Sequence, residues 1–160
     1  VTWRSDITLA GTLREVEIGW RKPSEQQLTW ARAKVADPVP ATGTTYLPRI
    51  YAERTLSMAD HPERAAVPVQ VLRIGDVGIG TLPCEVFCEI GLEFRKLCPL
   101  QPAFLVSFGH GYFGYLPTPE QHELGGYETW LGTNRMELDA SDKLLAQLIE
   151  MAAELKQTQR

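Results

Sequence analysis

Two β-rich segments separated by only two residues constrain the fold more than any other feature of the sequence. Residues 67–74 and 77–82 are rich in valine, isoleucine and leucine, and Gly75-Asp76 lies between them. Two residues of this type between β-rich segments favour a tight hairpin turn. The chain is therefore expected to contain at least one pair of adjacent antiparallel strands.

Helical and extended patterns alternate along the rest of the chain. Further strands are predicted at 12–20 and 103–108, and a loop at 37–43. Helices are predicted at 25–34, from about 45 to 60, from Pro83 up to Pro99, and at 141–155. This order predicts an α/β fold, with α+β as the other possibility, in which helices pack on a layered mixed sheet. No internal repeat or low-complexity linker divides the sequence, so we predict one domain over 1–160 without a separate second domain.

Composition excludes several classes of protein. Apolar residues make up 44% of the 160 residues and charged residues 22%, which is typical of a globular domain. The net charge of −4 gives no basic surface for nucleic acid, and no apolar run approaches the ~18 residues of a transmembrane segment. The sequence opens at Val1 within a strand-like stretch and without an initiator methionine. We therefore expect a fragment of a larger domain, with some self-association through surface that the remainder would cover.

The three cysteines do not indicate a disulfide scaffold, because their number is odd and low. Cys84, Cys88 and Cys98 are interpreted as buried free thiols, since cysteine packs like a small apolar residue. The cysteines therefore do not indicate whether the protein resides in an oxidising or a reducing compartment.

Residues 108–130 combine aromatic side chains with glycine and proline, which is typical of a shaped loop that presents side chains. Within it, His110 lies between two glycines and is a candidate catalytic residue, although a structural histidine is the simpler interpretation. Tyr115 is either a core aromatic or a site residue. Upstream, Glu85 follows an apolar strand-like run, so it is either an acid in the first turn of a helix or a metal ligand or general base.

An ordered set of motifs resembles the C-terminal part of the catalytic domain of neutral (non-lysosomal) ceramidases. The motifs are Pro83-Cys84-Glu85, the string GYLPTPE at 114–120 and the string GYET at 126–129. The corresponding family strings are P-G-E, Y-[IV]-T-T-x-E-E and Y-E-x-x-[ST]. The resemblance covers roughly residues 69–131 and is that of a distant member.

The resemblance implies a zinc amidase that cleaves the N-acyl bond of a lipid-like amide. The family holds zinc with two histidines, a glutamate and a tyrosine, and the last two fall on Glu85 and Tyr115. Tyr112, Tyr127 and Glu128 are then expected to support the site. The histidines and a catalytic serine belong to an earlier part of the family's sequence, so the missing N-terminal half is an expected partner and the fragment is expected to be inactive alone. A secreted or periplasmic parent is also implied.

Two departures from the family bear on specificity. Cys84 stands where the family usually has glycine, and Pro117 and Pro119 stiffen the turn after the tyrosine. Both changes bear more on ceramide as substrate than on zinc.

A second hypothesis is a non-catalytic binding or accessory module whose loop 108–130 grips a carbohydrate or protein partner through its aromatic rings. Solvent-facing rings would favour this module. Rings that order Glu85 and Tyr115 would favour the hydrolase.

Overall fold

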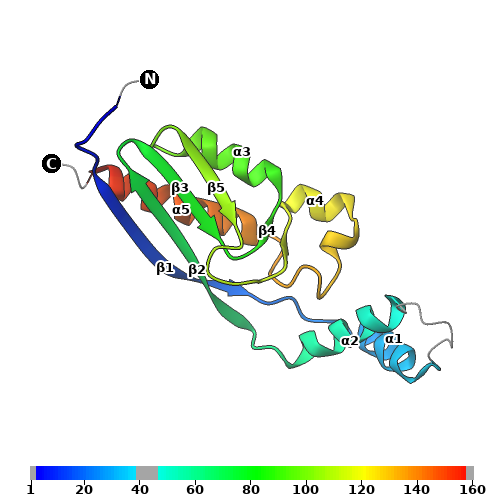
Figure 1. Cartoon of the computed structure of the whole chain (residues 1–160). Helices are drawn as coiled ribbons and strands as arrows, with labels where there is room; N and C mark the ends of the chain where they lie inside the picture. Colours follow the sequence, from blue (N-terminus) through cyan, green and yellow to red (C-terminus); the bar gives the residue numbers. More distant parts are fainter. Residues whose placement is uncertain (1–2, 39–46, 158–160) are drawn as a thin grey trace.

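The computed structural model describes residues 3–38 and 47–157, which form a mixed sheet with helices on one of its faces (Figure 1). The sheet has the strand order β1-β2-β3-β5. Its strands are β1 (Leu9–Gly19), β2 (Arg64–Ile74), β3 (Val77–Leu82) and β5 (Ala103–Ser107). A second, two-stranded sheet pairs β4 (Glu85–Val86) with β6 (Tyr115–Leu116). The predicted layered α/β fold with a mixed sheet is confirmed.

The four predicted helices are present as α1 (Glu25–Ala36), α2 (Leu47–Asp60), α3 (Cys88–Leu97) and α5 (Ala140–Gln157). Two further short helices, α4 (Pro119–Leu124) and the 3₁₀ helix η1 (Tyr127–Thr129), lie within the segment 108–130. The predicted start of the second helix at 45 and most of the predicted loop 37–43 lie outside the described residues. Within the described part of the chain, no helix is both long and apolar enough to cross a membrane.

The predicted hairpin is present between β2 and β3. Ile74 pairs with Val77, and Gly75 turns the chain with a φ of 61°, a value that glycine adopts without the steric penalty of a Cβ. β1 pairs antiparallel with β2, whereas β5 pairs parallel with β3. Because parallel neighbours need a crossover, the chain passes through α3 before it returns as β5.

The core lies between the sheet and the two helices α3 and α5. Along β2, the side chains of Val67, Val69 and Val71 are fully buried, whereas the intervening residues are only half-buried. This alternation identifies the face that α5 covers, since successive side chains of a strand point to opposite sides. Leu144 and Leu148 of α5 complete the buried cluster. Burying one such side chain contributes about 1.5–3 kcal/mol.

The segment after Pro83 differs from its prediction. The helix begins at Cys88, and Glu85 lies on strand β4, so the interpretation of Glu85 as an acid in the first turn of a helix is wrong. The reason is pairing with a distant segment: the Glu85 backbone N–H donates to the Gly114 carbonyl (3.0 Å) and the Phe87 N–H to the Leu116 carbonyl (3.3 Å). These hydrogen bonds hold the backbone extended.

The cysteine prediction is confirmed at two of three positions. Cys84 and Cys98 are buried and free, but Cys88 is free and exposed. Cys88 opens α3, and its thiol donates to the exposed Glu89 carboxylate instead of packing in the core. Burial raises the pKa of the Cys84 thiol to about 12, so this neighbour of Glu85 stays protonated at neutral pH.

Candidate functional site

The pairing of β4 with β6 brings Glu85 and Tyr115 together from positions 30 residues apart in sequence. The two are directly paired in the parallel register, so their side chains leave the small sheet on the same side. Both are half-buried. A carboxylate and a phenol hydroxyl are thereby presented side by side.

The loop between β5 and β6 is fixed onto the segment that carries Glu85. Backbone N–H groups of Phe108, Gly109 and Phe113 donate to carbonyls of Cys84, Leu82 and Pro83, at 3.2, 3.1 and 2.7 Å respectively. Both Phe108 (φ 62°) and His110 (φ 70°) adopt the left-handed region, which is uncommon for residues with a Cβ. The loop thus folds back over the end of β3 and places Tyr112 at Glu85.

Two tyrosine hydroxyls hydrogen-bond the central pair. The Tyr112 hydroxyl donates to Glu85 Oε1 at 2.9 Å, and the hydroxyls of Tyr115 and Tyr127 lie 3.0 Å apart. Burial, followed by the hydrogen bond to Glu85, raises the pKa of Tyr112. The Tyr127 hydroxyl first, and the Glu85 carboxylate second, raise the pKa of Tyr115, because both stabilise the neutral phenol. Both phenols are therefore protonated at neutral pH.

These groups line a polar pocket of about 370 Å³. Its lining comes from α2, from β4, from β6 and the loop before it, and from the segment 127–135. The lining residues are Tyr51, Arg54, Glu85, Tyr112, Tyr115, Tyr127, Gly132, Thr133 and Arg135. The Arg135 guanidinium lies over the Tyr112 ring, 5.2 Å from its centroid. The pocket therefore combines one carboxylate, four phenols and two permanent cations.

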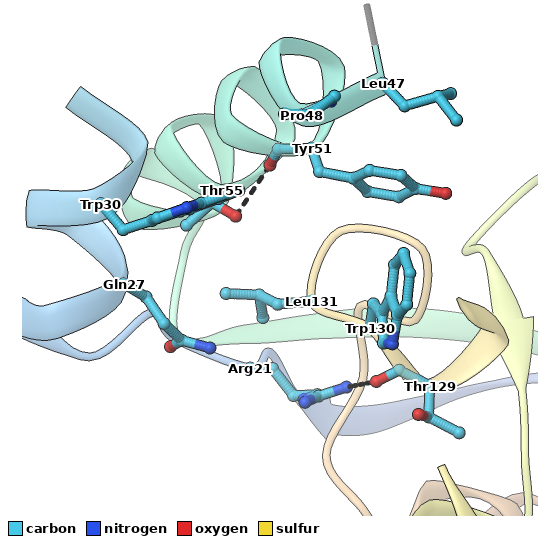
Figure 2. A pocket seen from close by; sticks show the side chains of 10 residues that line it. All are labelled: Arg21, Gln27, Trp30, Leu47, Pro48, Tyr51, Thr55, Thr129, Trp130 and Leu131. Carbon is cyan, nitrogen blue, oxygen red and sulfur yellow. Dashed lines mark hydrogen bonds between the residues drawn. The ribbon is translucent and has the colours of Figure 1, made fainter. Parts of the chain in front are cut away.

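An apolar pocket of about 590 Å³ adjoins the polar pocket, and both are lined by Tyr51 (Figure 2). It lies between helices α1 and α2 and the segment 129–131, with Trp30, Leu47, Trp130 and Leu131 among its lining residues. The rings of Tyr51 and Trp130 meet edge to face, with centroids 5.0 Å apart. A small polar site beside a larger apolar one is the usual construction of a small-molecule site.

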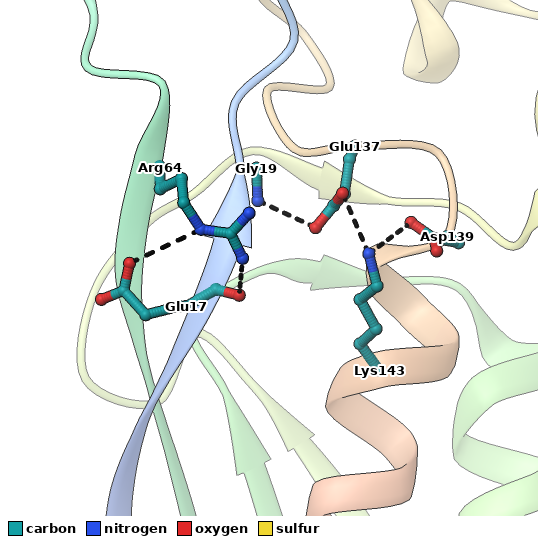
Figure 3. A network of polar contacts seen from close by, with 6 residues as sticks. All are labelled: Glu17, Gly19, Arg64, Glu137, Asp139 and Lys143. Atoms are coloured by element: carbon teal, nitrogen blue, oxygen red, sulfur yellow. Dashed lines mark hydrogen bonds and ion pairs between the residues drawn. The ribbon is translucent and has the colours of Figure 1, made fainter.

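The segment that carries Arg135 is anchored on the end of β1. The Arg21 N–H donates to the Arg135 carbonyl (2.9 Å), and the Glu137 N–H donates to the Gly19 carbonyl (2.8 Å). The Gly19 N–H donates in turn to the Glu137 carboxylate at 2.8 Å (Figure 3). Asn134 is fully buried; its side chain donates to the Tyr115 carbonyl (3.0 Å) and accepts from Arg21 (2.8 Å). This one amide therefore couples strand β6 to the polypeptide after β1.

The other predicted site residues lie outside the polar pocket. His110 is exposed and its Nε2 lies 3.1 Å from the Gln70 amide oxygen on β2. Glu128 is half-buried on η1 and does not line either pocket. The catalytic role of His110 and the supporting role of Glu128 stay predictions.

Sequence reasoning did not identify Tyr51, Arg54, Thr133 or Arg135 as lining residues. Tyr51 and Arg54 lie within the helix predicted from about 45 to 60, and nothing in the 133–135 segment resembles a motif. The position of these four residues in the pocket depends on how α2 packs against the segment 130–135. No local pattern encodes that contact.

Metal-ligand geometry is incomplete within the described residues. Among residues 3–38 and 47–157, no three His, Cys, Asp or Glu side chains gather closely enough to hold a metal ion. Glu85 and Tyr115 offer two adjacent oxygen donors, which suits half of a tetrahedral zinc site. The donor set therefore fits a metal whose other ligands come from elsewhere.

Two aromatic residues of loop 108–130, Tyr112 and Tyr127, show features of both expected environments. Tyr112 and Tyr127 are 50% and 47% exposed, yet their hydroxyls bond to Glu85 and Tyr115. The exposure agrees with a binding module and the hydrogen bonds agree with a site that these rings order. The binding-module hypothesis is thus not favoured over the hydrolase hypothesis.

Comparisons with known proteins relate this chain to ceramidases by fold. No protein-family model and no curated protein matches the sequence. The crystal structure of neutral ceramidase from Pseudomonas aeruginosa superposes with a TM-score of 0.63 at 16% identity, covering 94% of this chain and 29% of that one. A ceramidase complexed with C2 gives a TM-score of 0.60 at 14% identity, with 94% and 30% covered. The chain thus has the fold of a part of these ceramidases and spans less than a third of their length.

Proposed function

We propose that this chain is part of a zinc-dependent amide hydrolase that cleaves an N-acyl bond, and that Glu85 and Tyr115 are two of its metal ligands. The observation that carries the proposal is the direct pairing of these residues on β4 and β6 at one pocket. The fold shared with neutral ceramidase supports the same class of reaction.

The surroundings of the two donors suit this role. The Tyr112 hydroxyl holds one oxygen of Glu85 and leaves the other for a metal, and Tyr127 orients the Tyr115 hydroxyl. Such supporting hydrogen bonds fix the direction of metal ligands. Zinc, when bound, polarises the amide carbonyl and lowers the pKa of bound water toward ~7. The remaining ligands, two histidines in the family that the motifs resemble, would come from polypeptide outside this chain.

The apolar pocket supplies the complementary part of the substrate site. Its lining of tryptophan, leucine and tyrosine would bind an acyl chain, while the amide lies at Glu85 and Tyr115. Tyr51, which lines both pockets, would contact the junction between chain and amide. The substrate would therefore be lipid-like.

The isolated chain is expected to be inactive, because it contributes two ligands and the resemblance requires four. Incubation of the chain with zinc and N-octanoylethanolamine should release no fatty acid above the buffer rate. Turnover by the isolated chain that a chelator abolishes would show that the site is complete without further ligands.

The ligand assignment is tested in a longer polypeptide that contains this chain. Glu85→Gln and Tyr115→Phe should each reduce kcat/KM at least about 100-fold and lower the zinc content, since each removes a ligand. Glu93→Gln, which alters an exposed carboxylate paired with Lys96 on α3, is the matched control and should leave both quantities unchanged. Normal zinc content in the Glu85 and Tyr115 variants would exclude the assignment.

A further inference from the structure

Two arginines, Arg54 and Arg135, line the polar pocket. The Arg54 guanidinium lies 5.5 Å from the Tyr51 ring centroid, and its Nη1 is 3.4 Å from the Thr133 hydroxyl. Arg135 Nη1 is 3.4 Å from the Tyr112 carbonyl. Among the described residues, neither guanidinium has a carboxylate oxygen within 4.0 Å. Both are held by neutral groups through long hydrogen bonds, and most of their N–H donors remain available.

A glycine lies beside the stem of each arginine. A Cβ added to Gly132, where φ is 86°, would lie 2.8 Å from Arg54 Cβ. A Cβ added to Gly114, where φ is 82°, would lie 3.5 Å from Arg135 Cγ. The backbone therefore passes close to the stem of each arginine.

The charge in this pocket is opposite to that of the molecule. Arg54 and Arg135 bring two positive charges against the single negative charge of Glu85, whereas the chain as a whole has a net charge of −4. A metal at Glu85 would engage that carboxylate and leave the arginines unneutralised. Guanidinium groups bind carboxylates through paired, charge-assisted hydrogen bonds.

We infer that Arg54 and Arg135 form a carboxylate-binding subsite, so that the substrate is an N-acyl amino acid instead of an uncharged N-acyl lipid. The inference rests on the proposed amide hydrolysis and names its substrate class. An N-acyl amino acid carries a carboxylate beside its amide and a chain on the other side. The amide would lie at Glu85 and Tyr115, the carboxylate at the arginines, and the acyl chain in the apolar pocket.

The test compares the binding of two amides that differ only in this charge. N-octanoylglycine and N-octanoylethanolamine are titrated into the 160-residue chain by calorimetry at low ionic strength. N-octanoylglycine should bind at least about tenfold more tightly, because charge-assisted hydrogen bonds favour it. Arg54→Gln and Arg135→Gln should each weaken this preference and together abolish it. Unchanged binding of N-octanoylethanolamine by the variants will show that they are folded.

Arg95→Gln, on the exposed side of α3 and outside both pockets, is the matched control and should retain the preference. Equal affinity for the two amides, no binding of either, or a preference that persists in the double variant would overturn the subsite. The preference requires neither zinc nor turnover. A retained preference together with failed hydrolysis in the longer polypeptide would therefore reject the proposed function and leave the carboxylate site standing. Hydrolysis without any preference would reject only the subsite.

Discussion

At the scale of single residues, Glu137 links the start of α5 to the end of β1 and responds to pH. Its carboxylate accepts from the Gly19 N–H at 2.8 Å and from Lys143 Nζ at 2.9 Å (Figure 3). The Gly19 N–H first, and Lys143 among the further causes, lower the pKa of Glu137 below its ordinary value of 4.5. A carboxylate whose pKa is lower in the folded state stabilises the fold above its unfolded pKa. This contribution is lost as the pH falls through the folded pKa.

The prediction concerns the free energy of unfolding of Glu137→Gln, measured by urea denaturation between pH 3 and pH 7. The wild type should exceed the variant in stability at pH 6–7, and the difference should shrink as the pH falls below about 4.5. Glu150→Gln, which alters a more exposed carboxylate at the surface ion pair with Arg14, is the control and should show a smaller pH-dependent difference. A wild-type advantage that is constant with pH would mean that packing, and not charge, accounts for the Glu137 contribution.

At the scale of the elements, the sequence predicted those helices and strands that short-range patterns, such as turn residues and apolar spacing, determine. The β2–β3 hairpin followed from Gly75-Asp76 between two apolar runs, and the helices followed from their apolar spacing. β4 and β6 are each two residues long and pair across 30 residues, so no periodicity marks them. The helix predicted from Pro83 therefore starts too early, because α3 begins only at Cys88. The resemblance to a family did select Glu85 and Tyr115. Arg54 and Arg135 of the same pocket could not be predicted from the sequence, because only the packing of α2 on the segment 130–135 brings them there.

The β4–β6 element depends on a glycine, which a matched pair of substitutions can test. Gly114 (φ 82°) and Gly125 (φ 79°) both have a positive φ, so alanine at either position incurs strain of about 1–3 kcal/mol. A Cβ at Gly114 would also clash with the Thr133 carbonyl oxygen, whereas a Cβ at Gly125 would meet nothing within 4 Å. Gly114→Ala should therefore lower the free energy of unfolding by more than Gly125→Ala. It should also separate Tyr115 from Glu85.

Urea denaturation gives the free energies of unfolding of the two alanine variants, and the Tyr115 side-chain resonances report on the site. Equal destabilisation, with Tyr115 unperturbed in both variants, would mean that the segment around Thr133 yields without disturbing β6. Gly114 would then matter for its backbone conformation alone.

At the scale of the whole molecule, the sheet has one covered and one open face. Helices α3 and α5 pack on the first. The open face carries exposed apolar side chains from three strands, and they share this face because directly paired residues point to the same side of a sheet. These side chains are Leu9 and Leu13 on β1, Ile74 on β2, and Phe104 and Val106 on β5. The chain spans 29–30% of the length of the ceramidases that share its fold, so most of those proteins has no counterpart in this chain. We interpret this row of exposed apolar side chains as a face that another surface can cover.

We expect the isolated chain to associate with a second copy through this open face, because two such sheets can stack with their apolar side chains interdigitated. Sedimentation velocity should show dimers that increase with concentration. Leu13→Gln combined with Phe104→Gln should favour the monomer, because polar side chains on the face would lose water on stacking without gaining partners. Leu124→Gln, which replaces a 74% exposed leucine on α4 away from the sheet, should dimerise like the wild type. A wild type that stays monomeric at high concentration would show that this face is stable in water. A double variant that still dimerises would show that the dimer contact lies on another surface. The apolar pocket beside α1 and α2 would then be the next surface to test.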